Sequence, residues 1–157
     1  MHKLKTLIVD DEAELRKSVV ALLANVLEGV EFEISEAANG SDAVAMTKDE
    51  DYDLVLMDVR MPEMDGLEAL RLIKENDPRT FVVIMTAHSN LQDAVTAIKD
   101  GAYDYVEKPV NPTRLSEIIS KYLEAKEMVS SLALSNPILD DDVDSEFVGS
   151  SQKMKEV

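Results

Sequence analysis

Five polar side chains of this sequence stand at the points where β-strands would end. In chain order they are Asp10, Asp11, Asp58, Thr86 and Lys108. If the runs form one parallel sheet, these side chains meet at one edge, because the carboxyl ends of parallel strands lie together. The three carboxylates would repel one another there, and a divalent cation relieves such repulsion. An all-oxygen ligand set selects Mg²⁺ or a similar hard ion.

Asp58 is the candidate reactive group of this set. It ends the apolar run Leu54 to Met57, and a loop with Pro62 and Gly66 leads from it into an amphipathic segment. A lysine ammonium and a threonine hydroxyl at the same edge would supply a point charge and a hydrogen-bond donor suited to phosphoryl oxygens. A single aspartate in a loop is usually a helix cap or a turn former. That alternative accounts for each aspartate separately, but it does not explain why these residues would meet at one edge of the sheet. The pattern therefore favours phosphoryl chemistry at Asp58.

Strand and helix signals alternate along the chain. The predicted strands cover residues 7–9, 30–37, 54–57, 81–85 and 103–107. The first, third and fourth are continuous apolar runs, which are typical of strands buried on both faces of a parallel sheet. The second strand alternates and the fifth is mixed, so both belong at the edges. We therefore predict an α/β fold with a doubly wound parallel sheet in the order 2-1-3-4-5.

Helix boundaries follow from capping signals and from apolar side chains at helical spacing. We expect the first helix to end at Gly29, the second to begin at a Ser41 cap, and the last to begin at the Asn111-Pro112 pair. The fourth helix should be lined by the apolar stripe Leu91, Ala94, Val95 and Ile98.

Composition narrows the possible functions. The 157 residues carry a formal net charge of −16 and no cysteine. The negative charge argues against direct nucleic-acid binding, which needs a basic face, and against anionic membranes. The absence of cysteine removes disulfides, thiolate zinc sites and thiol catalysis. With no signal peptide and no apolar run of membrane length, we expect a soluble, cytoplasmic domain with an appendage.

Four segments carry a resemblance to a known family. They are IVDDE at residues 8–12, LVLMDVRMPEMDG at 54–66, VVIMTAH at 82–88 and GAYDYVEKP at 101–109. By these motifs, residues 1–123 resemble the receiver domain of two-component response regulators, a CheY-like domain of flavodoxin-like (βα)5 topology. The resemblance implies a regulatory phosphoacceptor whose only catalysis is its own phosphotransfer and dephosphorylation.

The resemblance also implies the roles of the acidic residues. Asp58 would accept a phosphoryl group from the phosphohistidine of a sensor histidine kinase and form an acyl phosphate. Mg²⁺ would be bound by Asp58, by Asp11 directly, by Asp10 mainly through water, and by the backbone carbonyl of Arg60.

Further residues around Asp58 acquire roles from the same resemblance. Lys108 would pair with the phosphoryl group, and Thr86 with Tyr105 would form a switch pair. The peptide bond from Lys108 to Pro109 would be cis. The side chains of Arg60 and His88 would flank the site, although a histidine in such a place is more often a partly exposed loop residue.

The segment after the fifth strand carries two apolar stripes. One stripe recurs at alternating steps of three and four, a heptad pattern, and consists of Leu115, Ile118, Tyr122, Ala125, Val129 and Leu132. The other, Leu115, Ile119 and Leu123, would face the sheet. Because the heptad stripe continues beyond residue 123, we predict an extended C-terminal linker helix that forms a homodimer over residues 112–134, together with a face of the receiver. An ordinary final helix with a frayed tail is the alternative.

We expect residues 124–146 to form a linker that is first helical and then acidic. The chain ends in EFVGSSQKMKEV, which resembles the opening of the AAA+ ATPase domain of sigma-54-dependent activators of the nitrogen-regulator C type, so residues 147–157 would begin that domain. No GxxxxGK[ST] loop occurs, so these residues cannot hydrolyse ATP by that route. The resemblance implies a receiver whose phosphorylation switches its dimer or oligomer state and thereby regulates the attached ATPase and transcription.

Two other functions fit parts of the pattern. A haloacid-dehalogenase-type phosphatase also uses Asp, Mg²⁺, Thr and Lys, but it keeps its nucleophile on the first strand in a D-x-D phrase. Here the first strand ends in Asp10-Asp11, and the candidate nucleophile Asp58 is on the third. A phosphate-independent dimerisation module with a receiver fold usually lacks an acidic residue or the lysine. None of these is missing, and this module is kept as the alternative.

Overall fold

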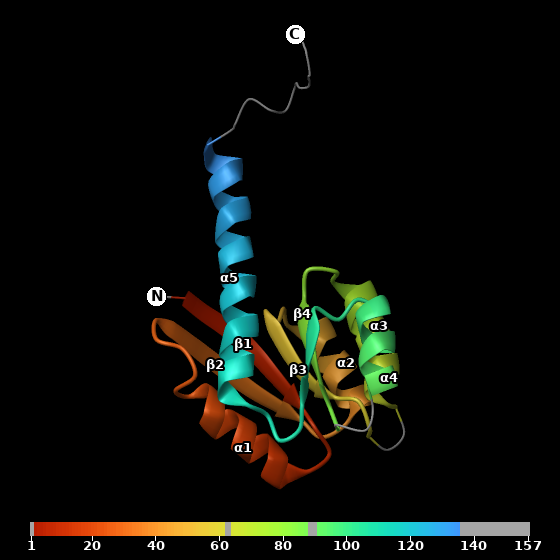
Figure 1. Ribbon diagram of the computed structural model, residues 1–157. Coiled ribbons are helices and arrows are strands. Elements are labelled where there is room, and N and C mark those ends of the chain that lie inside the picture. The colour runs from red at the N-terminus through yellow and green to blue at the C-terminus, as the bar shows by residue number, and fades with distance from the viewer. Residues whose placement is uncertain (1, 62–63, 88–90, 136–157) are drawn as a thin grey trace. The chain divides into compact units, whose positions relative to one another are not determined.

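The computed structural model of this chain describes residues 2–61, 64–87 and 91–135, and Figure 1 shows their arrangement. A 5-stranded sheet has the order β2-β1-β3-β4-β5, and all its neighbouring strands are parallel. The strands are β1 His2–Val9, β2 Val30–Ala37, β3 Leu54–Asp58, β4 Phe81–Thr86 and β5 Asp104–Glu107. The predicted α/β fold, the strand order and the edge positions of the second and fifth strands are confirmed.

The first strand is longer than the apolar run that predicted it. β1 pairs with β2 from His2, opposite Val30, but it pairs with β3 only from Thr6 onward. The early part of β1 therefore has a neighbour on one side only, and its side chains include exposed and half-buried ones. The run beginning at Leu7 marks only the part of the strand that lies inside the sheet.

The helices are α1 Ala13–Leu23, α2 Gly40–Asp49, α3 Gly66–Asn76, α4 Leu91–Lys99 and α5 Pro112–Ser135. The expectation that the first helix ends at Gly29 is wrong, because α1 ends at Leu23. Gly29 has a φ of +78°, and its carbonyl accepts a hydrogen bond from the N–H of His2 at 2.8 Å. Gly29 lies in the turn into β2. A positive φ is needed in such turns as well as at helix ends, so the glycine alone did not mark the end of the helix.

Two of the helices begin at asparagine caps. The Asn39 side chain accepts a hydrogen bond from a backbone N–H in the first turn of α2 at 2.7 Å. The cap is therefore Asn39 and not the predicted Ser41, which already lies inside the helix. The Asn111 side chain accepts a hydrogen bond from the N–H of Arg114 at 3.1 Å, and α5 begins at Pro112 as predicted.

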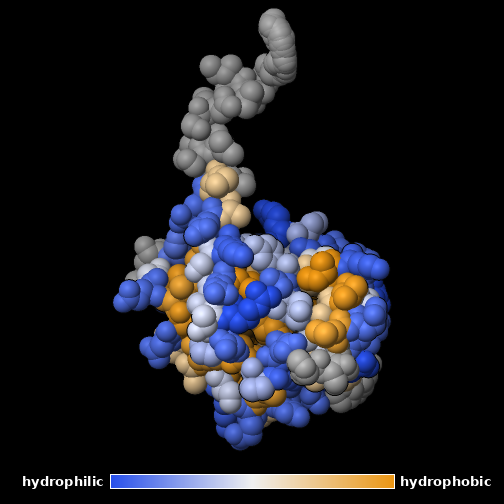
Figure 2. Space-filling model, viewed as in Figure 1, coloured by the Kyte–Doolittle hydropathy of each residue, from blue (hydrophilic) through white to orange (hydrophobic). Residues whose placement is uncertain are grey.

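The buried face of α4 differs from the predicted one. Ala94 and Ala97 are buried, whereas Leu91, Val95 and Ile98 are between 44% and 49% exposed. The helix contacts β4 and β5, and small alanine side chains allow a helix to lie close to a sheet. Figure 2 shows apolar side chains gathered on the surface at the position of α4. Of the predicted stripe only Ala94 is buried, and the other buried side chain of the helix, Ala97, lies outside the stripe, so the sheet selects the smaller side chains.

Helices cover both faces of the sheet. Figure 1 shows α1 and the first turns of α5 on one face, and α2, α3 and α4 on the other. On the second face, a single cluster of buried side chains includes Ala43, Val44, Ala69, Leu70, Ile73 and Ala97 from the helices. On the first face, Val19 and Leu23 of α1 are buried. Burial of this aliphatic surface, at about 25 cal/mol per Å², fixes the helices and therefore the loops that join them to the strands.

The chain divides into two compact units, Met1–Ile118 and Ile119–Val157. Helix α5 is continuous to Ser135, which confirms the extended C-terminal helix. No helix among the described residues is both long and apolar enough to cross a membrane. The acidic part of the predicted linker and the predicted start of an ATPase domain, residues 136–157, lie outside the described residues.

Burial along α5 ends where the shorter apolar stripe was predicted to end. Leu115, Ile119 and Leu123 are buried. The described side chains from residue 124 onward are exposed, and Met128 is 64% exposed. The helix therefore continues beyond the last buried position of its stripe, as the heptad pattern requires.

Gly66 allows the loop after β3 to fold back onto the end of its own strand. Its N–H donates a hydrogen bond to the carbonyl of Val59 at 2.7 Å. A Cβ atom at this position would overlap the backbone oxygen of Asp58 and lie 2.8 Å from the Cα of Val59. Because these neighbours are backbone atoms, they cannot move aside without moving Asp58 itself.

We predict that Gly66→Ala lowers the free energy of unfolding by at least about 2 kcal/mol, since the added methyl group displaces backbone atoms. Urea denaturation followed by circular dichroism measures the change. Gly29→Asn is the control, because nothing lies within 4 Å of a Cβ there and asparagine tolerates a positive φ. The control should cost less than about 1 kcal/mol. Equal costs for the two variants would show that the close approach at Gly66 is not limiting.

Candidate functional site

Three carboxylates meet at the carboxyl edge of the sheet. Asp10 and Asp11 follow β1, and Asp58 is the last residue of β3. One carboxylate oxygen from each residue lies within 4.8 Å of the others. Asp10 and Asp58 are buried, whereas Asp11 is exposed, so the cluster opens to solvent on the side of Asp11.

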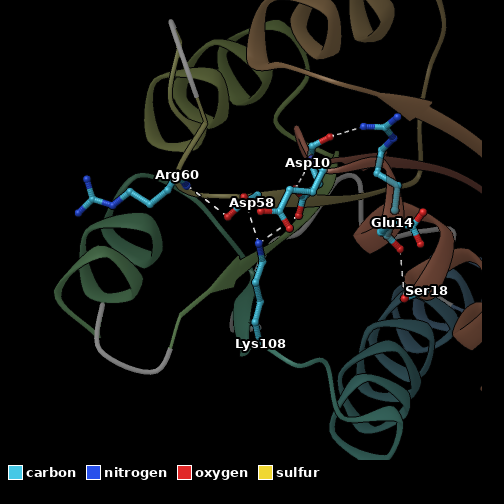
Figure 3. Close-up of polar contacts among 8 residues, drawn as sticks. Asp10, Glu14, Ser18, Asp58, Arg60 and Lys108 are labelled. Atoms are coloured by element: carbon cyan, nitrogen blue, oxygen red, sulfur yellow. Dashed lines mark hydrogen bonds and ion pairs between the residues drawn. The ribbon is translucent and has the colours of Figure 1, made fainter.

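Lys108 reaches this cluster from the end of β5. Its Nζ lies 3.1 Å from Oδ2 of Asp10 and 3.1 Å from Oδ2 of Asp58. Figure 3 shows the ammonium between the two carboxylates. The backbone N–H of Lys108 donates a hydrogen bond to the carbonyl of Thr86 at 2.8 Å, which places the lysine beside the end of β4. The peptide bond from Lys108 to Pro109 is cis, as predicted.

The charges in this cluster do not balance. Burial raises the pKa of the Asp58 carboxyl, and the bond from Lys108 opposes that rise without cancelling it. Burial alone would lower the pKa of Lys108, but its bonds to Asp10 and Asp58 outweigh burial and raise that pKa. The lysine is therefore charged at neutral pH, and a single ammonium faces three carboxylates. A bound cation would compensate the surplus of negative charge.

Arg16, which the sequence did not single out, holds the loop that carries Asp10. Its Nη1 donates a hydrogen bond to the backbone carbonyl of Asp10 at 2.6 Å, and its Nε donates to Glu36 of β2 at 2.9 Å. Asp10 in turn accepts a hydrogen bond from the N–H of Glu12 at 2.9 Å. Arg16 and Glu36 are 20 positions apart, so no local motif marks the pair.

The backbone of Arg60 contacts Asp58, whereas its side chain points away from the site. The N–H of Arg60 donates a hydrogen bond to Oδ1 of Asp58 at 3.3 Å. Figure 3 shows the guanidinium directed away from Asp58 and Lys108. Its Nη2 lies 2.9 Å from Oδ2 of Asp93 on α4. Asp93 was not singled out from the sequence, because an acidic residue in the first turn of a helix is common.

The two residues of the predicted switch lie on neighbouring strands. Thr86 ends β4, where its side chain is buried and its Oγ1 lies 3.4 Å from the carbonyl of Ala87. The Tyr105 ring on β5 packs partly against the core, and the guanidinium of Arg114 lies 6.0 Å from its centroid. The switching role of the pair stays a prediction. His88 lies outside the described residues.

The acidic cluster fits a hard divalent cation. Its three side chains offer only oxygen atoms, and they converge within 4.8 Å of one another. Mg²⁺ is usually held in proteins by a few carboxylates while it keeps several waters. The exposed position of Asp11 leaves room for such waters. The donor set and its opening to solvent therefore fit a hard divalent cation such as Mg²⁺.

Comparisons with known proteins agree with this geometry. Residues 6–120 match the family model described as the response regulator receiver domain. The chain is 41% identical over 124 residues to the regulatory protein AtoC of Escherichia coli strain K12, a match that covers 79% of this chain and 26% of AtoC. It is 33% identical over 156 residues to the response regulator protein PilR of Pseudomonas aeruginosa, covering 99% of this chain and 32% of PilR.

A solved structure gives the same result. The crystal structure of the receiver domain of NtrX from Brucella abortus matches with a TM-score of 0.68 and 36% sequence identity, over 76% of this chain and 98% of that one. This chain therefore corresponds to nearly all of that receiver domain. It spans only 26% of the length of AtoC and 32% of that of PilR.

We predict that millimolar Mg²⁺ raises the melting temperature of the wild-type protein and raises that of Asp11→Ala much less, because the variant lacks a carboxylate that we expect to bind the ion directly. Asp11 is exposed, so its removal should leave the fold intact. Differential scanning fluorimetry measures both shifts. Glu12→Ala, which removes the next exposed carboxylate along the chain, should keep the wild-type shift. An equal shift in wild type and Asp11→Ala would exclude Asp11 as a ligand.

Proposed function

The chain belongs to the response regulator receiver family, and from that membership we propose that Asp58 accepts a phosphoryl group from a sensor histidine kinase. The observation that carries the proposal is the position of Lys108 Nζ, 3.1 Å from both Asp10 and Asp58. A carboxylate at a strand end thus has a cation beside it and acidic partners for a metal. The protein would carry the phosphoryl group as a signal and would act in the cytoplasm.

The proposed transfer uses the carboxylate of Asp58 as the nucleophile. One of its oxygens attacks the phosphorus of a phosphohistidine, a P–O bond forms, the P–N bond breaks, and the histidine nitrogen leaves with the bonding pair. In the structure, the Arg60 N–H contacts Oδ1 and Lys108 contacts Oδ2, so both oxygens are held in place before the reaction. Lys108 would then pair with an oxygen of the transferred group.

The proposed cofactor is Mg²⁺. The carboxylates of Asp10, Asp11 and Asp58 and the backbone carbonyl of Arg60 would hold it. When bound, it would supply charge neutralisation for the phosphoryl oxygens. Support comes from the convergence of the three carboxylates and from their excess charge over that of Lys108.

A local change at Asp58 would reach the rest of the domain through Thr86 and Tyr105. Phosphorylation adds about −1.5 to −2 charges and three acceptor oxygens. The Thr86 hydroxyl would move to donate to one of these oxygens, and the Tyr105 ring would turn into the space that it leaves. The carbonyl of Thr86 already accepts the N–H of Lys108 at 2.8 Å, which couples the two residues. The surface formed by residues 91–107 would change as a result.

We propose that phosphorylation of Asp58 changes the dimer or oligomer state of the protein. Residues 112–134 would pair two copies, and the continuity of α5 to Ser135 supports this. In the full protein, the receiver (residues 1–123) would be joined by a linker (residues 124–146) to an AAA+ domain that begins at 147–157. That domain would activate sigma-54-dependent transcription, and the receiver itself would not contact DNA or a membrane.

We predict that Asp58→Asn abolishes labelling by acetyl phosphate in the presence of Mg²⁺, because an amide cannot form the acyl phosphate. Radiolabel incorporation measures the effect. The matched control is Asp65→Asn on the same loop. Asp65 caps α3 by accepting a hydrogen bond from the N–H of Glu68 at 2.9 Å, and asparagine caps as well. The control should label normally, and labelling of Asp58→Asn at the wild-type level would place the phosphoacceptor elsewhere.

We predict that Val129→Glu combined with Leu132→Glu yields a monomer that still accepts phosphate on Asp58, because the charges fall on heptad core positions. Sedimentation velocity with and without Mg²⁺ and beryllofluoride, a phosphoryl mimic, measures the assembly. Ser130→Glu with Ser131→Glu adds the same charge off the heptad seam and should assemble as wild type does. A Val129/Leu132 variant that remains as dimeric as wild type would exclude the coiled coil.

A further inference from the structure

An ion pair joins the phosphoacceptor loop to helix α4. Nη2 of Arg60, two residues after Asp58, lies 2.9 Å from Oδ2 of Asp93 in the first turn of α4. The Arg60 side chain is 69% exposed, whereas that of Asp93 is 16% exposed. The pair thus connects an exposed cation on the loop after Asp58 to a largely buried anion on a neighbouring helix.

Charge attraction alone makes this contact. Oδ2 of Asp93 is buried and has no hydrogen bond of good geometry, although Arg60 Nη2 is only 2.9 Å away. The guanidinium N–H is therefore not aligned with the oxygen. A charged pair without an aligned hydrogen bond, on a side chain as exposed as that of Arg60, is weak and can be exchanged for a better partner.

A phosphoryl group on Asp58 would be that better partner. The N–H of Arg60 already donates to Oδ1 of Asp58 at 3.3 Å, so the arginine side chain starts next to the reacting carboxylate. In Figure 3 it extends in the opposite direction. A guanidinium binds phosphoryl oxygens through two parallel N–H bonds, a geometry that the contact with Asp93 lacks.

We propose that Asp93 is a positioning residue that holds the Arg60 guanidinium on α4 until a phosphoryl group on Asp58 competes for it. The inference rests on the proposed function of Asp58. When Arg60 leaves, the buried oxygen of Asp93 loses its counter-charge, which is unfavourable, so the start of α4 relaxes. The exchange links phosphorylation to α4 through charged side chains, separately from Thr86 and Tyr105.

An ion pair just beyond the other end of α4 provides the matched comparison. Nη1 of Arg71 on α3 lies 3.1 Å from Oδ2 of Asp100, which follows the last turn of α4. The exposures of these side chains, 51% and 24%, are similar to those of Arg60 and Asp93. Because the helices run antiparallel to the strands, the end of α4 lies at the sheet edge opposite Asp58. Removing Asp100 therefore removes the same charge and an ion pair of similar exposure, although one that is also a hydrogen bond at 3.1 Å, without affecting Arg60.

The test is the affinity of the 157-residue chain for beryllofluoride in excess Mg²⁺, measured by calorimetric titration. Asp93→Asn removes the competitor for Arg60 and should tighten binding about two- to fivefold, the range expected for a weak ion pair. Arg60→Gln should weaken binding. The double variant Arg60→Gln/Asp93→Asn should bind as Arg60→Gln alone does, and Asp100→Asn should bind as wild type does.

Three results would overturn the proposal. Asp93→Asn could leave the affinity unchanged, it could tighten binding equally in the Arg60→Gln background, or Asp100→Asn could tighten it as much. The first would mean that no competition exists, and the others that Asp93 acts only through its general charge. Hydrogen exchange of the α4 amides adds an independent measure, since Arg60→Gln leaves the Asp93 carboxylate without its counter-charge and should increase exchange at the start of the helix, whereas Arg60→Gln/Asp93→Asn should increase it less.

The proposed function can fail separately from this inference. If acetyl phosphate does not label Asp58 in the wild-type chain, the phosphoacceptor assignment is wrong and the inference fails with it. If Asp58 is labelled and the Asp93→Asn effect is absent, only the positioning role of Asp93 is wrong.

Discussion

A single ammonium shared by two buried carboxylates holds the carboxyl edge of this sheet together. Lys108 contacts Asp10 and Asp58 at the same distance of 3.1 Å, and thereby joins the ends of β1, β3 and β5. Asp10 and Lys108 are 98 positions apart in the chain, so only the folded sheet can bring them together. Removing Lys108 would leave these buried carboxylates without their counter-charge, which is unfavourable. The position of Lys108 is therefore a structural requirement as much as a chemical one.

At this edge of the sheet, the burial of charged side chains that the proposed reaction needs is unfavourable for folding. Burial raises the pKa of Asp58, and the bonds from Lys108 do not fully offset this, so the ionised carboxylate is less favourable here than in water and a bound cation would favour it. The surrounding fold supports this arrangement. Gly66 lets the loop after β3 lie against the strand end, and Arg16 clamps the backbone of Asp10 to Glu36 on β2. The aliphatic core beneath supplies the stability that a charged edge of this kind lacks.

The helices differ in how firmly they are fixed, and this decides where a change at Asp58 can spread. Helix α3 buries Leu70 and Ile73, whereas α4 buries only alanines and leaves Leu91, Val95 and Ile98 half-exposed. Because hydrophobic stabilisation scales with the apolar area removed from water, α4 is the more easily displaced of the two. It also carries Asp93, the partner of Arg60. A weakly packed helix with an ion pair to the site is suited to respond when the charge at Asp58 changes.

The sequence by itself determined which strands are central and which polar side chains share an edge, because continuous apolar runs that end in Asp58 or Thr86 are typical of buried parallel strands whose ends meet. It also marked where burial along α5 stops, at Leu123. Only the tertiary structure decided which face of α4 is buried, since helical spacing defines a stripe but not the side-chain size that the sheet accepts. The structure alone also revealed the contacts of Arg16 with Glu36 and of Arg60 with Asp93. Such pairs join residues on different elements, and their geometry depends on how the chain folds in space, which local patterns do not encode.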